Sequence, residues 1–225
     1  MCNGHKLSTG GNYNFLQKRI SMKNKYLNNF FVFFVGLSLS IQIHAQSWKF
    51  IKEKDGIKLY SRQETGNKLQ TFKGVSKINI PVDQVFELLE DVNHREWWDK
   101  NLDQIKLLKY EKDKLSQYYL VYKMPWPFTN RDMYVEVTTS INQSTGEHKL
   151  TAVPLAGTQK EYENLVRIKN YKQQWIIKPL SKDITQVELE FYVSPAENLP
   201  DWLINMILID SPINSINGLR AQFKK

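Results

Sequence analysis

The sequence has little of the chemistry on which most enzymes and metalloproteins depend. It contains one cysteine, Cys2, which excludes an internal disulfide and a cysteine-rich metal site. Only two of its four histidines, His94 and His148, lie beyond residue 45, and neither stands beside a serine or cysteine in a recognised motif. Because a metal site needs several ligands at fixed spacing, we expect no metal. The absence of a Gly-x-Gly-x-x-Gly motif and of a phosphate-binding loop gives no indication of a nucleotide or any other cofactor.

Long hydrophobic runs are also missing. The longest, residues 30–41, has 12 residues, whereas a membrane-spanning helix needs about 20. Two basic residues, Lys23 and Lys25, precede this run, and the small residue Ala45 follows it. This arrangement is typical of a secretory signal peptide, with a buried core helix as the alternative.

We therefore expect residues 1–45 to be a leader that is removed. Residues 1–21 are interpreted as lying upstream of the true start at Met22, and residues 22–45 as a signal peptide cleaved after Ala45. The product, residues 46–225, is then exported to the periplasm or the extracellular space. Its length is that of one domain, and we expect it to be a monomer.

The strong positive charge of the whole chain comes mainly from that leader. The net charge of the full sequence is +8, but five of its 31 basic residues and none of its 23 acidic residues lie in positions 1–45. Residues 46–225 therefore carry 26 basic and 23 acidic residues, a net of +3. Nucleic-acid binding needs a clustered basic face, so we expect no nucleic-acid partner.

Hydrophobic periodicity predicts an α+β protein dominated by antiparallel strands. Residues 57–63 and 69–79 alternate and predict a hairpin. A helix is expected after Pro81, with apolar residues three and four apart on one face. Alternation then predicts a meander of strands at 116–124, 131–140, 148–158, 171–180 and 185–194.

The chain ends in an apolar stretch, residues 199–223, that predicts one long helix with a defect. Pro212 lies in its interior, where proline removes the hydrogen bond to the carbonyl of Leu208 and costs about 3 kcal/mol. We therefore expect a kink or break near 208–212. The segment before it becomes a lid whose motion releases a ligand, and the alternative is that Pro212 only begins a second helix.

Aromatic residues on the strands are the most informative part of the composition. Tyrosine and tryptophan can fill an ordinary core, which is the simplest interpretation for most of them. They can also line a cavity, because each has an apolar body and one hydrogen-bonding group. In the segment Gln117–Tyr122, aromatic residues occupy both faces of the expected strand, so one face lies inside the sheet and the other outside.

Two motifs resemble the steroidogenic-acute-regulatory-related lipid transfer (START) domain. The stretches REWWDKNL at 95–102 and MPWPFTNRDMY at 124–134 carry the likeness. The matching residues are Arg95, Trp98 and Asp99, followed by Pro125, Pro127, Thr129, Arg131 and Asp132. The resemblance covers nearly all of residues 48–223. It implies the helix-grip fold, in which a curved antiparallel sheet wraps a long C-terminal helix around a hydrophobic tunnel that binds one lipid-like molecule.

Strand alternation together with this resemblance gives a set of candidate residues. The expected ligand-binding residues are Tyr119, Met124, Tyr134, Glu136, Trp175, Trp202 and Met206. Glu136 is either a polar group of the cavity or a solvent-facing residue. The apolar residues Val135 and Val137 occupy strand positions where some family members carry a basic residue. They favour a neutral, sterol-like or acyl ligand.

A second set of residues is expected to hold the structure together: Trp98, Asp99, Arg131 and Asp132. Arg131 can pair with Asp132 or with Asp99 and so fix the turn at 123–130 to the helical region. Trp126 and Phe128 can anchor the same turn. A buried ion pair of this kind often serves geometry more than net stability.

Three functions are compatible with these features. The first is non-catalytic binding and transfer of a hydrophobic ligand, with transient contact to a membrane surface. The second is an enzyme resembling polyketide cyclases and aromatases, which needs placed acid–base groups, with Tyr119, Tyr134 and Glu136 as candidates. The third is an interaction domain whose interior is filled by side chains. An exported protein is separated from cytoplasmic substrates, so we favour the first.

Overall fold

The computed structural model describes Met1 and residues 47–64, 69–194 and 199–224. Gln46–Lys225 form one compact unit. The predicted leader and its cleavage after Ala45 fall outside the described residues, Met1 apart, and stay predictions. Among the helices that are described, none is both long and apolar enough to cross a membrane.

The elements follow one another as two short strands, a strand, a helix, a run of strands and two helices. Their bounds are β1 (Lys49–Lys54), β2 (Ile57–Gln63), β3 (Gln70–Ile78), α2 (Val82–Glu90), β4 (Leu102–Glu111), β5 (Leu115–Tyr122), β6 (Arg131–Asn142), β7 (Glu147–Pro154), β8 (Val166–Arg167), β9 (Asn170–Ser181), β10 (Ile184–Ser194), α3 (Asp201–Leu208) and α4 (Ser211–Gln222).

The strands form one curved, almost wholly antiparallel sheet. Its order is β1-β2-β3-β10-β9-β7-β6-β5-β4, and the short β8 pairs with β6 in parallel. The chain therefore passes from β3 across to β4 and returns through β10, which joins the N-terminal hairpin to the meander. This arrangement confirms the predicted α+β fold class.

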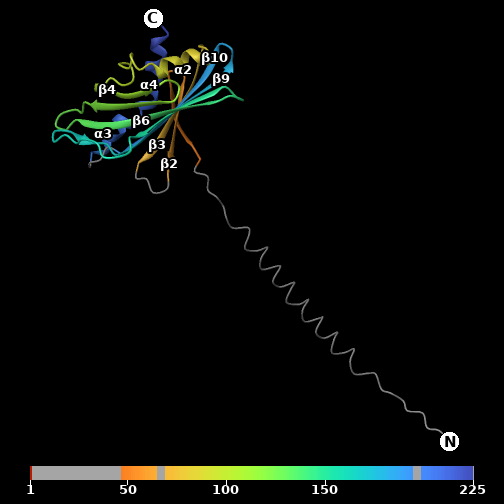
Figure 1. Ribbon diagram of the computed structural model, residues 1–225, viewed down its shortest axis with the longest axis horizontal. Coiled ribbons are helices and arrows are strands. Elements are labelled where there is room, and N and C mark those ends of the chain that lie inside the picture. Colours follow the sequence, from red (N-terminus) through yellow and green to blue (C-terminus); the bar gives the residue numbers. More distant parts are fainter. Residues whose placement is uncertain (2–46, 65–68, 195–198, 225) are drawn as a thin grey trace. The chain divides into compact units, whose positions relative to one another are not determined.

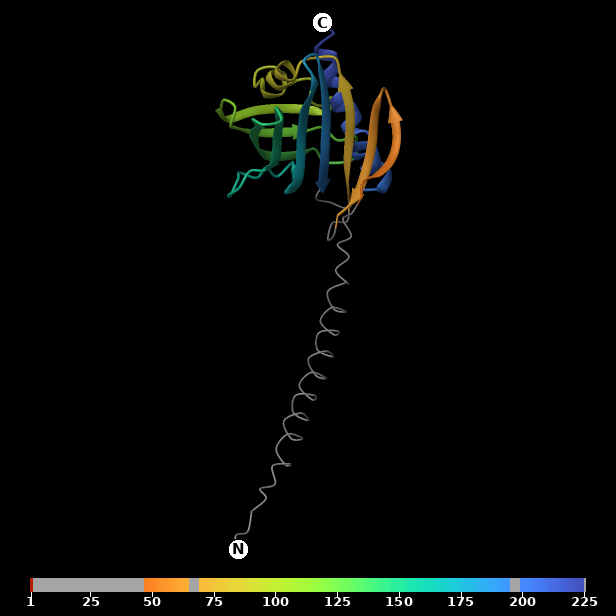
Figure 2. The same ribbon diagram turned by 90° about the vertical axis from the view of Figure 1, so that its right-hand side faces the viewer.

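Helix α4 packs on the inner face of the sheet, against β2, β3 and β10. Figure 2 shows α4, in dark blue, beside these strands. Its buried residues are Pro212, Ile213, Ile216 and Leu219. Gly74 on β3 allows the approach, because a Cβ at this position would lie 3.0 Å from both Ile216 and Pro212.

The C-terminal helix is broken where the sequence predicts a break, but proline causes less disruption than expected. Helix α3 ends at Leu208 and α4 begins at Ser211, with Asp210 as its N-cap. Pro212 lies in the first turn of α4, where its missing N–H has no intrahelical partner in any case. The cost of about 3 kcal/mol for a proline in a helix interior therefore does not arise. The lid motion stays a prediction.

Two strands that the sequence did not reveal, β1 and β4, form the edges of the sheet. Most of their side chains are exposed, so their sequences, KFIKEK and LDQIKLLKYE, lack a buried apolar face. Lys52 of β1 reaches the break between the C-terminal helices and forms an ion pair of 2.6 Å with Asp210. The edge strand thus contacts that break.

Candidate ligand-binding cavity

The sheet and the helices border a cavity of about 450 Å³. Strands β5, β6, β7, β9 and β10 form its wall, and α2, the loop around Trp98, α3 and the start of α4 cover it. Figure 1 shows α2 and α3 near opposite ends of the strands β4 and β6. The middle of the wall is apolar and includes Leu120, Met133, Val135, Leu150, Trp175 and Val193.

This volume is far larger than a packing defect. Ligand pockets of proteins typically have volumes of about 300 to 1,000 Å³, and a cavity of 450 Å³ lies in that range. Protein interiors otherwise contain few voids larger than a single water molecule. The interior is therefore not filled by side chains, contrary to the interaction-domain alternative.

Polar side chains gather at the end of the cavity where β5 stops and β6 begins. They are Asp99, Tyr122, Arg131, Tyr171 and Gln173. The Tyr171 hydroxyl donates to Gln173 Oε1 at 2.7 Å, and the backbone N–H of residue 101 donates to Asp99 Oδ1 at 2.8 Å. Arg131 is 1% exposed, and its Nη1 donates to the carbonyl oxygen of Thr129.

Burial at this polar end favours the protonated, uncharged forms of its acidic side chains. Burial raises the pKa of Asp99 above its ordinary value. Burial raises the pKa of Tyr122 as well, and the nearby charge of Asp99 adds to the effect. The phenol of Tyr122 is therefore neutral at physiological pH and can both donate and accept hydrogen bonds.

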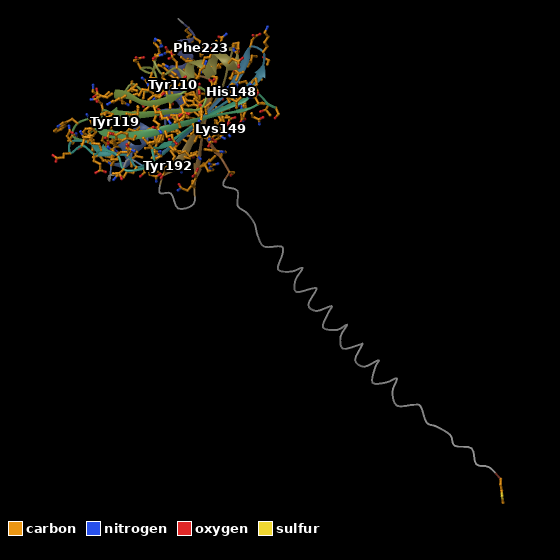
Figure 3. All side chains as sticks on the ribbon, viewed as in Figure 1. Tyr110, Tyr119, His148, Lys149, Tyr192 and Phe223 are labelled. Carbon is orange, nitrogen blue, oxygen red and sulfur yellow. The ribbon has the colours of Figure 1, made fainter. Side chains whose placement is uncertain are left out.

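A second group of polar side chains lies at the opposite end of the cavity, beside the last turn of α2. It consists of Glu90, Tyr110, Ser116 and Thr139. Thr139 Oγ1 donates to Glu90 Oε1 at 2.7 Å, and the backbone N–H of Asp113 donates to Glu90 Oε2 at 3.2 Å. Burial raises the pKa of Glu90. Figure 3 shows Tyr110 near the α2 end and Tyr119 towards the other end.

Five of the residues singled out from the sequence line this cavity: Met124, Trp175, Trp98, Asp99 and Arg131. Trp98 also packs edge-on against Tyr118, with ring centroids 5.4 Å apart. Trp202 is instead 59% exposed, and its ring lies 6.4 Å from that of Phe128. The side chain of Met206 falls outside the described residues.

Three other candidates lie on the opposite face of the sheet. The rings of Tyr119 and Tyr134 are 4.7 Å apart, and that of Tyr162 lies 5.6 Å from Tyr119. Glu136 accepts a hydrogen bond of 2.8 Å from Gln117. Their assignment to the cavity face is therefore wrong, because adjacent residues of a strand point to opposite sides.

The sequence did contain the information needed to choose the correct face. On β6 the residues Met133, Val135 and Val137 are all apolar, whereas the alternate set contains Tyr134, Glu136 and Thr138. Pairing in register then assigns Tyr118, Leu120 and Tyr122 of β5 to the inner face. Aromatic content was a poorer guide than the apolar alternation of the neighbouring strand.

Two ion pairs were expected for Arg131, with Asp132 or with Asp99. Asp132 pairs with another arginine instead, and Asp99 accepts a hydrogen bond of 2.8 Å from the backbone N–H of residue 101. Both oxygens of Asp132 accept hydrogen bonds from Arg167, each 2.8 Å long. Arg167 also stacks on Tyr134, with its guanidinium carbon 4.8 Å from the ring centroid. Because Arg131 and Asp132 are neighbours in β6, their side chains point to opposite faces. Asp132 thus ties the segment carrying β8 to the outer face of the sheet.

The turn at 123–130 exposes an aromatic residue instead of burying it. The peptide bond between Trp126 and Pro127 is cis, and Trp126 is 93% exposed. The turn is closed by Met124 N donating to Asn130 Oδ1 at 3.0 Å and by Phe128 N donating to the Pro125 carbonyl at 3.0 Å. The expectation that Trp126 anchors the turn is therefore wrong.

The described part of the chain contains no cluster of three or more histidine, cysteine, aspartate or glutamate residues that could hold a metal ion. The polar groups of the cavity are instead of the kind that fixes the ends of an organic ligand. They are few, they lie at two ends, and an apolar wall separates them.

Comparison with known proteins gives a consistent family assignment. The sequence profile of the START domain matches residues 36–225. An uncharacterized protein of Pseudomonas aeruginosa is 31% identical over 182 residues, which cover 80% of this chain and 89% of that protein. The phosphatidylcholine transfer protein of Bos taurus is 26% identical over 166 residues, or 71% of this chain and 76% of that protein.

Solved structures show the same fold. A STAR-related lipid transfer protein from Xanthomonas axonopodis superposes with a TM-score of 0.70 at 28% identity, covering 79% of this chain and 99% of that one. Human StAR-related lipid transfer protein 5 superposes with a TM-score of 0.69 at 15% identity, covering 93% of this chain and 100% of that one.

Proposed function

Because the chain belongs to the START domain family, we propose that it binds one hydrophobic ligand of the lipid class in its cavity and transfers it between membranes. The observation that carries the proposal is the cavity of about 450 Å³ with an apolar wall. Each methylene moved from water into such a site contributes about 0.8 kcal/mol. An alkyl chain therefore supplies ample binding free energy without any specific contact.

The polar ends of the cavity give the ligand its orientation. Buried hydrogen-bonding groups such as Tyr122 and Glu90 cost free energy if a ligand leaves them without partners. A ligand with polar groups at the corresponding positions is therefore favoured over a plain hydrocarbon. A lipid-binding site is expected to work in this way, because its apolar surface supplies affinity and its few polar groups supply specificity.

The proposed role is binding and not catalysis. The acid–base candidates of the enzyme alternative are Tyr119, Tyr134 and Glu136. All three have their contacts on the outer face of the sheet and do not line the cavity. The phosphatidylcholine transfer protein of Bos taurus and the Xanthomonas lipid transfer protein carry transfer functions in their names. Their likeness supports the same class of function here.

Contact with a membrane surface belongs to the same proposal. Trp126 is 93% exposed and Trp202 is 59% exposed, and Phe128 links the two segments through its contact with Trp202. Tryptophan prefers the interface between water and lipid. Export after cleavage at Ala45 places the carrier in the envelope or outside the cell, where no cytoplasmic carrier can act.

The test is to identify what the purified protein carries. Mass spectrometry of organic extracts is expected to find one lipid-class molecule per protein, and the protein is expected to speed lipid exchange between donor and acceptor vesicles. Replacing Val135 with Trp fills the apolar middle of the cavity and should abolish both results. Tyr134→Phe, on the neighbouring residue of the outer face, is the matched control and should leave both unchanged.

Two outcomes contradict the proposal. One is an empty protein that binds no lipid in a titration and leaves the exchange rate between vesicles unchanged. The other is a Val135→Trp variant that folds, keeps its lipid and exchanges it at the original rate, which shows that the cavity is not the site. Circular dichroism checks that each variant has the same sheet content.

A further inference from the structure

We propose that the end of the cavity beside α2 binds a protonated primary amine of the lipid ligand, and that Glu90 is the residue that selects it. This inference rests on the proposed function and names the chemistry at one end of the ligand. It differs from the neutral ligand expected from Val135 and Val137, because that expectation considered only strand residues and Glu90 comes from a helix.

Glu90 is the last residue of α2, and it lines the cavity. The C-terminal end of a helix carries a partial negative charge, which stabilises a cation placed there. The last turn of α2 contains no basic residue, and Lys109 and Lys114 of the β4–β5 hairpin pair with Glu111 instead, at 2.6 and 2.8 Å. The cavity is therefore bordered at this end by a carboxylate and by the negative end of a helix dipole.

The carboxylate of Glu90 has hydrogen-bond donors but no cation as a partner. Thr139 Oγ1 donates to its Oε1 at 2.7 Å, and the backbone N–H of Asp113 donates to its Oε2 at 3.2 Å. Within the described part of the chain, no lysine, arginine or histidine forms an ion pair with Glu90. A carboxylate offers about four acceptor positions, so positions remain for a ligand. Because removing an unpaired charge from water is costly, a cationic group on the ligand offsets that cost.

Three hydroxyl groups line the cavity at the same end, on Tyr110, Ser116 and Thr139. An ammonium group has three N–H donors and accepts no hydrogen bond. A hydroxyl oxygen has two lone pairs, so Thr139 can accept a hydrogen bond from a ligand while it donates to Glu90. The carboxylate and the hydroxyl oxygens together can therefore satisfy all three donors of an ammonium group.

The charges around Glu90 act in the same direction. Burial raises the pKa of Glu90, and the charge of Asp113 adds to the effect. Burial also raises the pKa of Tyr110, and the charges of Glu90 and Asp113 add to it. Because a negative potential raises the pKa of an acid, both shifts indicate that acidic groups dominate this end of the cavity. A protonated amine gains free energy from the same potential.

The experiment compares three probes with the same decyl chain by isothermal titration calorimetry with the delipidated protein. They are decylamine, decan-1-ol and decyltrimethylammonium, measured at about pH 8, where an alkylamine is protonated and a carboxyl group is ionised. Decylamine is expected to bind one per protein, about fivefold or more tightly than decan-1-ol, which is the upper range for an ion pair near a protein surface. Decyltrimethylammonium has the same charge but no N–H donor, and it is expected to bind less tightly than decylamine.

Variants assign the preference to Glu90. Glu90→Gln keeps the size and shape of the side chain but removes its charge, and it should bring the affinity for decylamine down to that for decan-1-ol. Glu87→Gln, on the exposed face of the same helix, is the matched control and should keep the preference. Ser116→Ala removes one acceptor of the ammonium group and should lower the affinity for decylamine severalfold, which provides a test if Glu90→Gln does not fold.

Two kinds of lipid supply a protonated primary amine: a long-chain amine and an aminophospholipid, which carries it in the head group. Vesicles with equal parts of dioleoylphosphatidylethanolamine and dioleoylphosphatidylcholine distinguish them. Extracted lipid that is enriched in the ethanolamine form assigns the amine to a head group. No extraction, together with tight binding of decylamine, assigns it to a long-chain amine. Extraction of both phospholipids in equal amounts contradicts the inference.

The outcomes separate this inference from the proposed function. Equal affinity for decylamine and decan-1-ol, or for decylamine and the quaternary ammonium probe, overturns the amine site while lipid binding stands. A preference that survives Glu90→Gln, or that Asp99→Asn at the opposite end abolishes, overturns its assignment to the end beside α2. Failure of all three probes, together with a protein that carries no lipid when purified, overturns the proposed function itself.

Discussion

The inner face of the sheet has two halves that differ in how they are covered. Over β2, β3 and β10 it is filled by α4, and residues such as Ile57, Leu59 and Ile216 have no exposed surface. Over β5, β6, β7 and β9 it is hollow, and shorter segments at the margins close it. One 12-residue helix of about 18 Å cannot cover both halves of so wide a sheet.

The difference shows how one strand pattern serves two purposes. In the filled half the apolar side chains meet a helix and contribute stability. In the hollow half similar side chains, such as Met133 and Val135, face the cavity and not a packed helix. An apolar ligand in the cavity gains dispersion contacts with these side chains, so this half of the sheet contributes binding free energy.

The largest expected effect comes from truncating matched residues in the two halves. Ile216→Ala in the filled half should lower the free energy of unfolding by about 4 kcal/mol, because it opens a new cavity under α4. Met133→Ala in the hollow half should lower it by about 2 kcal/mol, since one side of the Met133 side chain faces the cavity and not a packed element. Urea denaturation of the delipidated protein measures both. Equal losses contradict the comparison.

A smaller effect is expected from adding one methyl group to the filled half. In Gly74→Ala the new Cβ lies 3.0 Å from both Ile216 and Pro212, so α4 has to shift. Overpacking of this kind typically costs about 1 to 3 kcal/mol. Ala152→Val is the counterpart, since Ala152 borders the cavity and even two added methyl groups find room. Thermal unfolding should show a loss for the first variant only.

The margin where α2 closes the hollow half carries a pH-dependent contribution. His148 is buried, its ring packs 4.4 Å from that of Phe86, and burial lowers its pKa below its ordinary value, near 6.5, despite Asp83 and Asp113 nearby. His148 binds a proton more readily in the unfolded chain than in the folded one. Its contribution to the free energy of unfolding is therefore fully present above about pH 6.5. It falls below that pH by up to about 1.4 kcal/mol per unit.

The variant His148→Leu should remove this slope between pH 6.5 and 5. The measurement is the urea midpoint as a function of pH. A wild-type protein whose stability rises on acidification over this range, or a slope that His148→Leu leaves intact, contradicts the assignment.

The smallest effect is expected at the boundary between the two halves, where α3 gives way to α4. Pro212→Ala removes a residue that fits the first turn of α4, so the loss should be about 0.4 to 1 kcal/mol, mainly through the unfolded chain. Replacing a proline in a helix interior would instead raise the free energy of unfolding. A clear gain in melting temperature contradicts the observed placement of Pro212.

The sequence predicted much of the fold because its elements carry strong periodic patterns. Helix α2 is present with Val85, Phe86 and Leu89 buried, and the hairpin of β2 and β3 has its expected bounds to within a residue. Strands β1 and β4 were not predicted, because these edge strands bury no continuous apolar face. The break near 208–212 was confirmed, while the energetic role of Pro212 depended on where the second helix starts, which proline itself does not reveal.

The candidate site divides in the same way. Asp99 and Arg131 were found by motif, and the structure places them in the cavity wall. Tyr119 and Tyr134 were assigned to the wrong face, because a strand with aromatic residues on both sides does not show which side is concave. Glu90 was missed, since it is one acid among several on an amphipathic helix until Thr139 and Asp113 come next to it.

By itself the sequence determined the fold class, the order of most elements and the family, because periodicity and short motifs are local properties of a chain. Only the tertiary structure decided which face of each strand lines the cavity, that Asp132 pairs with Arg167 and not with its neighbour, and that polar side chains gather at both ends of the cavity. These are distances between segments remote in sequence, and they depend on the curvature of the sheet and on how far α4 covers it.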